Sequence, residues 1–508
     1  MQMTSTNLTA VRSRSGNVRE LARPAVPWLA VAGAALFAGI LATGEADAWL
    51  GQTPALLLLA ALLGTTFLVV FSFLGSLAII VWPVAATGGY LLGIPRAHPV
   101  ITFDRVWIGG MLAYIALNPR RTGRGAFTRP LLFGLLWLVV SYGLRAFATS
   151  STIGGPAATW LDAIVLPAIL FIGCERYCLA GAERARRLMG ALMIAGGVLA
   201  TIGIAERIFG FQLATIRGGT ARFDAAIDQT RISGPYPFPE PYALSVIICF
   251  AATLYWIQSR RRGDSYQWAL VLAALQVIAI ALVYFRAAWI AAVVVLIAAF
   301  GIRPGRFGRM FAVAGIVAAL VLAATSQLQQ SKSFSTRANN TTNVYGRLAA
   351  YKQSFDLFES APFFGIGVNR YHDVAITRRP ETVSNVAAPP DPHNSYTQLL
   401  AEQGIVGLLP FLLLSYGVWR LLRGLRAASF RSREALLLTG TVTGAALGYL
   451  LVSLTLAMLP YEPSNAFLAV LLGAASARLD TVETQAARDR FEVAGRASSA
   501  READAGAG

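Results

Sequence analysis

Long apolar stretches recur along the whole chain and are separated by short polar segments. A helix needs about 17 to 25 residues to cross the hydrocarbon core of a bilayer. By that measure the pattern predicts about 14 spans, at residues 26–43, 54–73, 75–94, 103–118, 130–148, 158–173, 187–206, 242–257, 267–284, 286–302, 309–325, 398–420, 435–459 and 463–477. We therefore expect an all-α polytopic membrane protein with about 12 to 14 transmembrane helices.

The composition supports this fold class. Of 508 residues, 56% are hydrophobic and 14% are charged, and the mean hydropathy is +0.56. Soluble domains are roughly half apolar and a quarter charged. The three cysteines do not form the dense pattern of a disulfide framework. We expect a basic N-terminal segment, one transmembrane domain and a flexible polar tail, at residues 1–25, 26–477 and 478–508.

The net charge of +17 does not indicate nucleic acid binding, because the arginines sort to one side of the predicted bundle. The positive-inside rule makes that side cytoplasmic. The basic segments are 1–25, 119–129, 183–187, 259–262, 303–309 and 420–433. The opposite side receives short, poorly basic connections and two long loops, which are expected to carry function.

These two loops, at residues 207–241 and 326–397, contain many basic residues although they lie outside. The charge rule weakens for long loops, so a merely solvated surface is one interpretation. The other is a cationic chamber that binds an anion. In the larger loop, Leu348, Tyr351, Phe355 and Phe358 recur at helical spacing. This spacing predicts an amphipathic helix on the outer surface, over residues 345–362.

Two single residues stand out beside these loops. Arg286 is the only charged residue between Asp264 and Arg303. The chain is expected to turn near it at the lipid boundary, where an arginine is costly and indicates function, although snorkelling to a headgroup is an alternative. His393 follows the prolines of PPDPH and precedes a predicted helix with Ser395 as N-cap and Gln398 completing a capping box.

A neutral imidazole at that place can accept a proton from a hydroxyl nucleophile, although a lone loop histidine can also be only a surface residue. The glycines of FFGIGVNRY at 363–371 fit a turn better than a phosphate-binding loop. Asp224 and Asp228 fit solvated loop acids better than a metal or base pair. The chain has three histidines, His98, His372 and His393. They form no metal-binding pattern, so neither a metal nor a cofactor is expected.

The order of motifs resembles the O-antigen ligase and polymerase superfamily of membrane glycosyltransferases. The matching elements are the arginine in YFRAAW, the arginine that opens YGRLAAYKQSFDLFESAPFFGIGVNRY, and HNSYTQLLAEQGIVGLLPF. The resemblance implies an inverting, metal-independent enzyme of the bacterial inner membrane, with its site facing the periplasm. It would move a glycan from undecaprenyl pyrophosphate to a hydroxyl of a lipid, glycan or protein acceptor in surface polysaccharide biosynthesis.

The resemblance assigns the family's functional arginines to Arg286 and Arg347 and its loop histidine to His393. Guanidinium groups bind phosphate oxygens through paired hydrogen bonds, which suits a pyrophosphate leaving group. Residues expected to contact substrate are Arg231, Arg370, Asn394 and Tyr345, and Glu402 is a weaker candidate. Ligation to lipopolysaccharide or another acceptor and polymerisation of exopolysaccharide both fit this set. A polytopic transporter fits less well, because repeated halves with broken helices are not evident.

Overall fold

The computed structural model describes most of the chain between residues 76 and 505. The described residues are 76–89, 107, 110–112, 114–116, 118–120, 123–149, 156–211, 213, 223–224, 229–260, 266–301 and 342–505. The chain divides into two units, one of residues 1–78 with 106–119 and one of residues 79–105 with 120–508. In the first unit the structure describes only short pieces, so the account below concerns the second.

Helices make up nearly all of the described part. They are α5 (Ser76–Gly89), α7 (Arg129–Thr149), α8 (Pro156–Trp160), the π-helical turn η1 (Leu161–Val165), α9 (Leu166–Cys178), α10 (Ala182–Phe209), α12 (Pro239–Gln258), α13 (Gln267–Leu282), α14 (Arg286–Gly301), α17 (Thr342–Ser360), α18 (Tyr371–Thr377), α19 (Ser395–Ala428), α20 (Arg433–Ser453) and α21 (Glu462–Ala505). Two short antiparallel pairs complete the list, β1 (Phe223–Asp224) with β2 (Gln229–Thr230) and β3 (Thr382–Val383) with β4 (Val386–Ala387).

Seven segments in the described part are long and apolar enough to cross a membrane, which confirms the all-α polytopic fold class. They are 129–148, 156–178, 182–209, 239–258, 395–428, 433–453 and 462–493. The shorter apolar helices α13 and α14 occupy the spans predicted at 267–284 and 286–302. The spans predicted at 26–43, 54–73 and 309–325 lie outside the described residues, as does half of 103–118. The total number of spans therefore stays a prediction.

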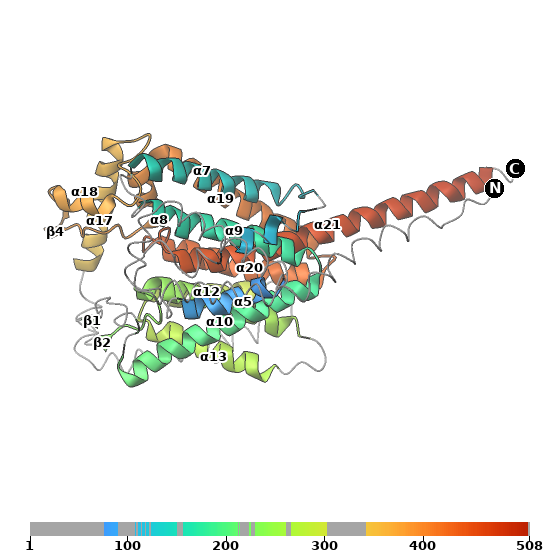
Figure 1. Ribbon diagram of the computed structural model, residues 1–508, viewed down its shortest axis with the longest axis horizontal. Coiled ribbons are helices and arrows are strands. Elements are labelled where there is room, and N and C mark those ends of the chain that lie inside the picture. Colours follow the sequence, from blue (N-terminus) through green and yellow to red (C-terminus); the bar gives the residue numbers. More distant parts are fainter. Residues whose placement is uncertain are drawn as a thin grey trace, which may run out of the picture. The chain divides into compact units, whose positions relative to one another are not determined.

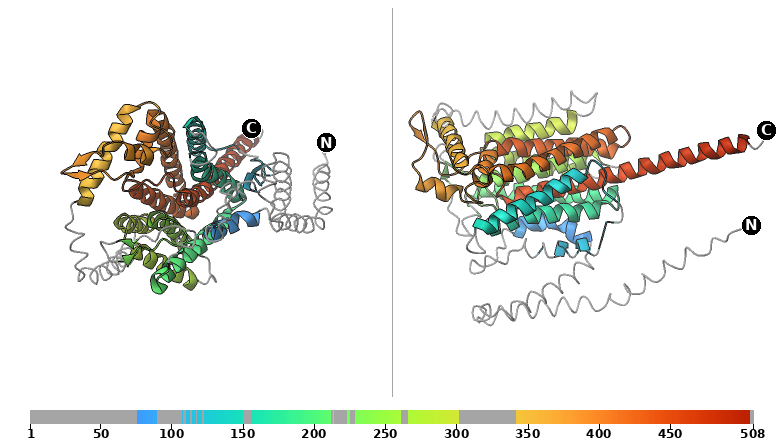
Figure 2. Two further views of the ribbon diagram at one scale, coloured as in Figure 1. Left: turned by 60° about the vertical axis from the view of Figure 1, so that its left-hand side comes forward. Right: turned by 90° about the horizontal axis from the view of Figure 1, so that it is seen from above.

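The spans lie side by side with α12 among the most buried (Figures 1 and 2). It packs against α10, α13, α14, α20 and α21. Around this group, α7 packs on α19, and α9 packs on α21. Pro239 and Pro241 open α12, where a missing N–H costs no hydrogen bond, so the helix begins directly after the polar loop.

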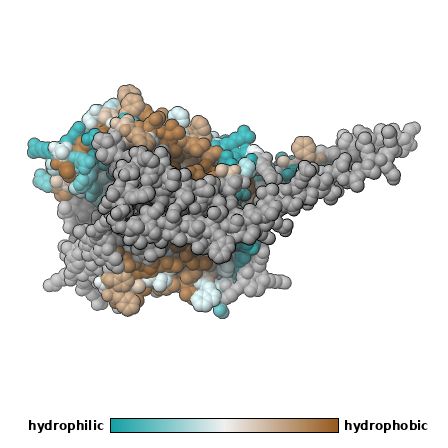
Figure 3. Space-filling model, in the orientation of Figure 1, coloured by the Kyte–Doolittle hydropathy of each residue, from teal (hydrophilic) through white to brown (hydrophobic). Residues whose placement is uncertain are grey.

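The outward face of α7 shows how the bundle meets lipid. Large apolar side chains recur on it every three or four residues and are exposed, namely Phe133, Trp137, Val140, Leu144 and Phe147. On the visible described surface, hydrophobic residues cover the sides of the helices and hydrophilic residues lie at their ends (Figure 3). An apolar face of this size would be unusual in water and is normal in a bilayer.

Three helices differ from their predicted lengths. The span predicted at 398–420 runs over the whole of α19 and is kinked at Gly404. The span predicted to end at 459 ends at Ser453, followed by a loop up to Tyr461. α21 continues through residue 478, where the tail was predicted to begin, and Arg478 and Asp480 are buried. The flexibility of the tail stays a prediction.

A buried ion network joins the loop before α7 to α9 and α21. Arg120 Nη1 lies 2.5 Å from Glu175 Oε1, and the other terminal nitrogen of Arg120 pairs with Asp480. Arg124 donates to both oxygens of Glu175. Glu175 is fully buried, so its charge is tolerated only because both guanidinium groups neutralise it. The network fixes the basic 120–129 segment to the end of the bundle.

We predict that Glu175→Gln destabilises the protein by about 3–5 kcal/mol, because it leaves a buried guanidinium without its carboxylate. Glu183→Gln is the matched control, since its ion pair with Arg187 is exposed and contributes about 0.3–0.5 kcal/mol. Thermal unfolding of the detergent-solubilised protein measures both. Equal shifts of the two variants would show that the buried network does not hold this end of the bundle.

Candidate active site

His393 is held directly before the first turn of α19. Asn394 is the N-cap, and its Oδ1 accepts hydrogen bonds from the backbone N–H of Tyr396 at 2.8 Å and of Thr397 at 3.3 Å. The predicted capping box with Ser395 as N-cap is therefore wrong. Ser395 is already helical, and tertiary contacts occupy its hydroxyl. The placement of His393 just outside a helix N-terminus is confirmed.

The loop after α20 anchors this end of α19. The Ser395 hydroxyl donates to the carbonyl of Leu456 at 2.8 Å and accepts from the N–H of Met458 at 2.7 Å. The Asn394 Nδ2 donates to the carbonyl of Leu454 at 3.3 Å. With both ends of its amide engaged, Asn394 has a structural role, and its predicted contact with substrate stays a prediction.

The predicted amphipathic helix is α17, and it brings Arg347 to His393. One turn after Arg347, the Tyr351 hydroxyl donates to the same Leu454 carbonyl at 3.1 Å. α17 and the cap of α19 therefore meet at one backbone atom. Tyr345 lies two residues before Arg347, about 200° around the helix, so it points to another side. Leu348 and Phe355 are exposed, and α17 buries its other face against α19.

A second arginine approaches from the loop before α12. Arg231 forms an ion pair with Glu240 at 2.9 Å and donates from Nε to the carbonyl of Val283 at 3.1 Å. Val283 lies in the turn between α13 and α14, and Arg286 is the first residue of α14. The predicted turn at Arg286 is thus confirmed. Arg286 is exposed, and within the described residues no contact joins its side chain to His393.

Burial and charge together keep His393 neutral. Partial burial lowers the pKa of its imidazole below the ordinary 6.5, and the positive charge of Arg347 lowers it further. The negative charges of Asp391 and Glu240 act in the opposite direction. These four side chains, from α12, α17 and the 389–394 segment, therefore act on one another. An imidazole with a lowered pKa is neutral at pH 7 and can accept a proton.

The glycine-rich segment 363–371 packs against the first turns of α19. Its backbone bonds to the kink of α19, with Ile366 N–H donating to Ala401 O at 2.9 Å and Ile405 N–H to Pro362 O at 3.0 Å. Gly365 and Gly404 have φ of +67° and +63°, and a Cβ on either would collide with the other segment's backbone. The predicted preference for a structural turn fits this packing.

Other predicted residues lie apart from this cluster. Arg370 is exposed at the start of α18, and no contact in the described part joins it to His393 or Arg347. The buried Glu402 accepts the N–H of Tyr371 at 3.1 Å, which is a structural contact. Asp224 is in strand β1, not in a helix, and Asp228 lies outside the described residues.

Sequence reasoning missed Glu240 and Asp391. Glu240 follows Arg231 by nine residues, and this spacing was the available signal for its ion pair. Asp391 precedes His393 by two residues and also pairs with the Nδ1 of His372 at 2.8 Å. Among the described residues, no group of three or more His, Cys, Asp or Glu side chains is placed to hold a metal ion. Metal independence of the reaction stays a prediction.

We predict that His393 titrates below pH 6.5 and that Asp391→Asn moves its pKa lower still, because a negative charge beside the imidazolium is lost. His372→Gln is the control, since it keeps the Asp391 carboxylate and should leave the His393 pKa nearly in place. Nuclear magnetic resonance of labelled histidine side chains measures both. A higher His393 pKa in the Asp391→Asn variant than in the wild type would refute the arrangement around His393.

Comparison with known proteins addresses the family. No curated protein matches the chain at a significant level. A family model described as O-antigen ligase matches residues 268–412. This range contains Arg286, Arg347 and His393 and ends within α19, whereas Arg231 and Glu240 precede it. The match confirms the resemblance seen in the motifs. Residues 268–412 are similar to the O-antigen ligase family, which supports membership of the O-antigen ligase superfamily for this polytopic membrane protein.

Proposed function

We propose that the protein transfers a glycan from undecaprenyl pyrophosphate to an acceptor hydroxyl during surface polysaccharide biosynthesis. The observation that carries the proposal is the cluster at the loop end of the bundle. There a partly buried, neutral His393 lies within the electrostatic reach of Arg347 and of Glu240, the ion-pair partner of Arg231. A general base beside cationic groups suits attack by a hydroxyl with departure of an anion.

In the proposed step, the acceptor oxygen attacks the anomeric carbon of the donor glycan. The bond from that carbon to the pyrophosphate oxygen breaks, and the undecaprenyl pyrophosphate leaves with the electron pair. His393 takes the hydroxyl proton or orients the hydroxyl. Arg347 and Arg286 bind the pyrophosphate oxygens, because planar guanidinium groups form paired, charge-assisted hydrogen bonds with phosphate.

Glu240 is assigned a positioning role in this scheme. Its ion pair sets the direction of the Arg231 guanidinium, whose Nε is also fixed on Val283. The same hydrogen bonds connect α12 to the turn that presents Arg286. One carboxylate therefore orients Arg231 and helps to place the start of α14. The carboxylate also offsets part of the positive charge around His393.

Substitution separates the proton role from the charge role. We predict that His393→Ala keeps donor binding and lowers turnover by roughly a hundredfold or more, the scale of a lost general base. Arg347→Lys and Arg286→Lys keep the charge but lose the planar fork, so transfer should fall severely. His372→Ala and Arg378→Lys are exposed controls that should leave activity unchanged. Wild-type turnover in His393→Ala would remove His393 from the mechanism.

From the arginine-rich connections we infer that the site faces the periplasmic side of the inner membrane. We predict that a cysteine at Ser384, an exposed residue between β3 and β4, reacts with a membrane-impermeant reagent in intact cells. A cysteine at Ser429, at the end of α19, should react only after permeabilisation. The three native cysteines are buried and should contribute little labelling. Labelling of Ser429 in intact cells would invert the orientation.

Polymerisation onto a second undecaprenyl-linked glycan is the alternative within the same superfamily. Both reactions use the same donor end and the same cluster of residues. We predict that purified protein given only the lipid-linked donor does not lengthen the glycan, because a ligase needs a different acceptor. Gel separation of the products measures the glycan length. Elongation under these conditions would identify a polymerase instead.

A further inference from the structure

A pocket lined by two arginines lies at the opposite end of α19 from His393. It has a volume of about 390 Å³. Its lining residues are Phe127, Gly424, Ala427, Ala428, Arg431, Val482, Glu483, Ala486, Ala487 and Arg490. The 34 residues of α19 separate it from the candidate active site by about 50 Å along the helix. The pocket is therefore no part of the transfer site.

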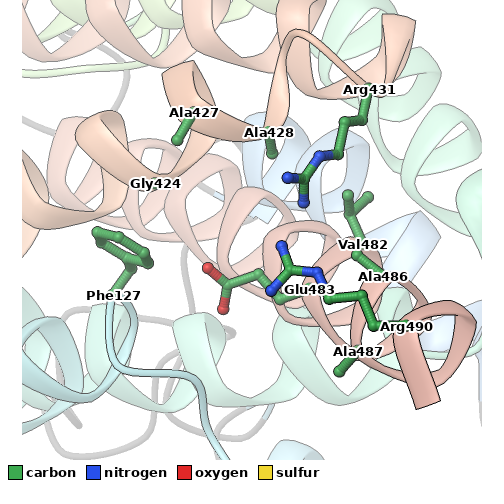
Figure 4. Close-up of a pocket in the computed structure, with 10 residues that line it drawn as sticks. All are labelled: Phe127, Gly424, Ala427, Ala428, Arg431, Val482, Glu483, Ala486, Ala487 and Arg490. Atoms are coloured by element: carbon green, nitrogen blue, oxygen red, sulfur yellow. The ribbon is translucent and has the colours of Figure 1, made fainter. Parts of the chain in front are cut away.

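Two arginines are directed into this pocket. Figure 4 shows the guanidinium groups of Arg431, after α19, and Arg490, on α21, pointing toward one another. Within the described residues neither side chain has an ion pair or hydrogen bond. The carboxylate of Glu483 also lines the pocket and lies between the Phe127 ring and these guanidinium groups in Figure 4, but it forms no ion pair with either arginine in the described part of the chain. Two convergent guanidinium groups bind an anion such as a phosphate well.

The surroundings of the pocket are those of a membrane interface. Tyr416, Trp419 and Phe430 are exposed nearby on and after α19. Such aromatic side chains gather at the level of lipid headgroups. Arg420 covers the ring of Phe127 at 5.0 Å, and Arg423 covers that of Trp419 at 5.5 Å. The pocket therefore combines the charges of Arg431 and Arg490 with an apolar wall of alanine, valine and phenylalanine side chains.

We propose that this pocket binds the headgroup of an anionic phospholipid, with the phosphate between Arg431 and Arg490 and the glycerol and acyl chains along the apolar wall. A free phosphate would use the guanidinium groups but gain nothing from the wall. Basic pockets between helices at the inner membrane face have the charge to select anionic lipids. The proposal is independent of the glycan chemistry, since it concerns the other end of the bundle.

The test measures lipid that stays bound to the purified full-length protein. Native mass spectrometry compares phosphatidylglycerol with phosphatidylcholine, each with and without excess inorganic phosphate. Wild type should retain phosphatidylglycerol selectively and keep it in phosphate. Arg431→Gln with Arg490→Gln should lower retention by about tenfold. Arg426→Gln with Arg488→Gln removes the same charge from exposed neighbours outside the pocket and should not.

A second variant guards against indirect effects. Ala427→Trp fills the pocket without a change of charge and should also displace the lipid, while thermal unfolding verifies that each variant is folded. Undiminished retention in the double arginine variant or in Ala427→Trp would overturn the proposal. So would equal retention of phosphatidylcholine, or release of the lipid by inorganic phosphate, which would identify a site for a soluble anion.

Discussion

The carbonyl oxygen of Leu454 is the atom on which the candidate site depends. It accepts hydrogen bonds from Tyr351 of α17 and from Asn394, the cap of α19. Arg347 lies one turn before the first donor, and His393 directly precedes the second. A single acceptor in the loop after α20 therefore fixes the relative positions of the proposed base and of an anion-binding arginine. The hydrogen bond from Tyr351 is exposed and the one from Asn394 is partly buried, so each contributes on the order of 1 kcal/mol.

Close backbone contacts also hold the 363–371 segment against α19. Gly365 and Gly404 allow the 363–371 segment to bond directly to the kinked first turns of α19. This segment connects α17 to α18, so its contact with the kink positions both helices. On the far side, the Arg231–Glu240 pair connects α12 to the α13–α14 turn. The charged side chains thus come from segments that are far apart in sequence and are held by local geometry.

Apolar periodicity predicted much of this fold because lipid imposes one rule on every span: its backbone hydrogen bonds must close within the helix. Run length and charge therefore located the α13–α14 turn at Arg286 and the amphipathic α17. The motifs likewise indicated His393 and Arg347 before any geometry was known. Tyr345 and Arg370 had similar local signals, but Tyr345 lies on another side of α17 from Arg347, and Arg370 is exposed before α18.

The remaining features depended on tertiary contacts that a linear pattern does not contain. Ser395 has the chemistry of an N-cap, but its hydroxyl is taken by Leu456 and Met458, so Asn394 caps α19. The kink at Gly404 arises from the approach of Gly365, some forty residues earlier in the chain. Glu240 becomes meaningful only once Arg231 and His393 are placed beside it. Pairing of distant charges is set by packing rather than by spacing.

In the proposed reaction, glycan transfer and departure of the lipid pyrophosphate are one event. The direct measurement incubates purified protein with a labelled undecaprenyl-pyrophosphate glycan and a hydroxyl acceptor, and quantifies both products over time. One undecaprenyl pyrophosphate should be released for each glycan joined to the acceptor. Transfer of glycan without release of the carrier, or release that does not depend on the acceptor, would contradict it.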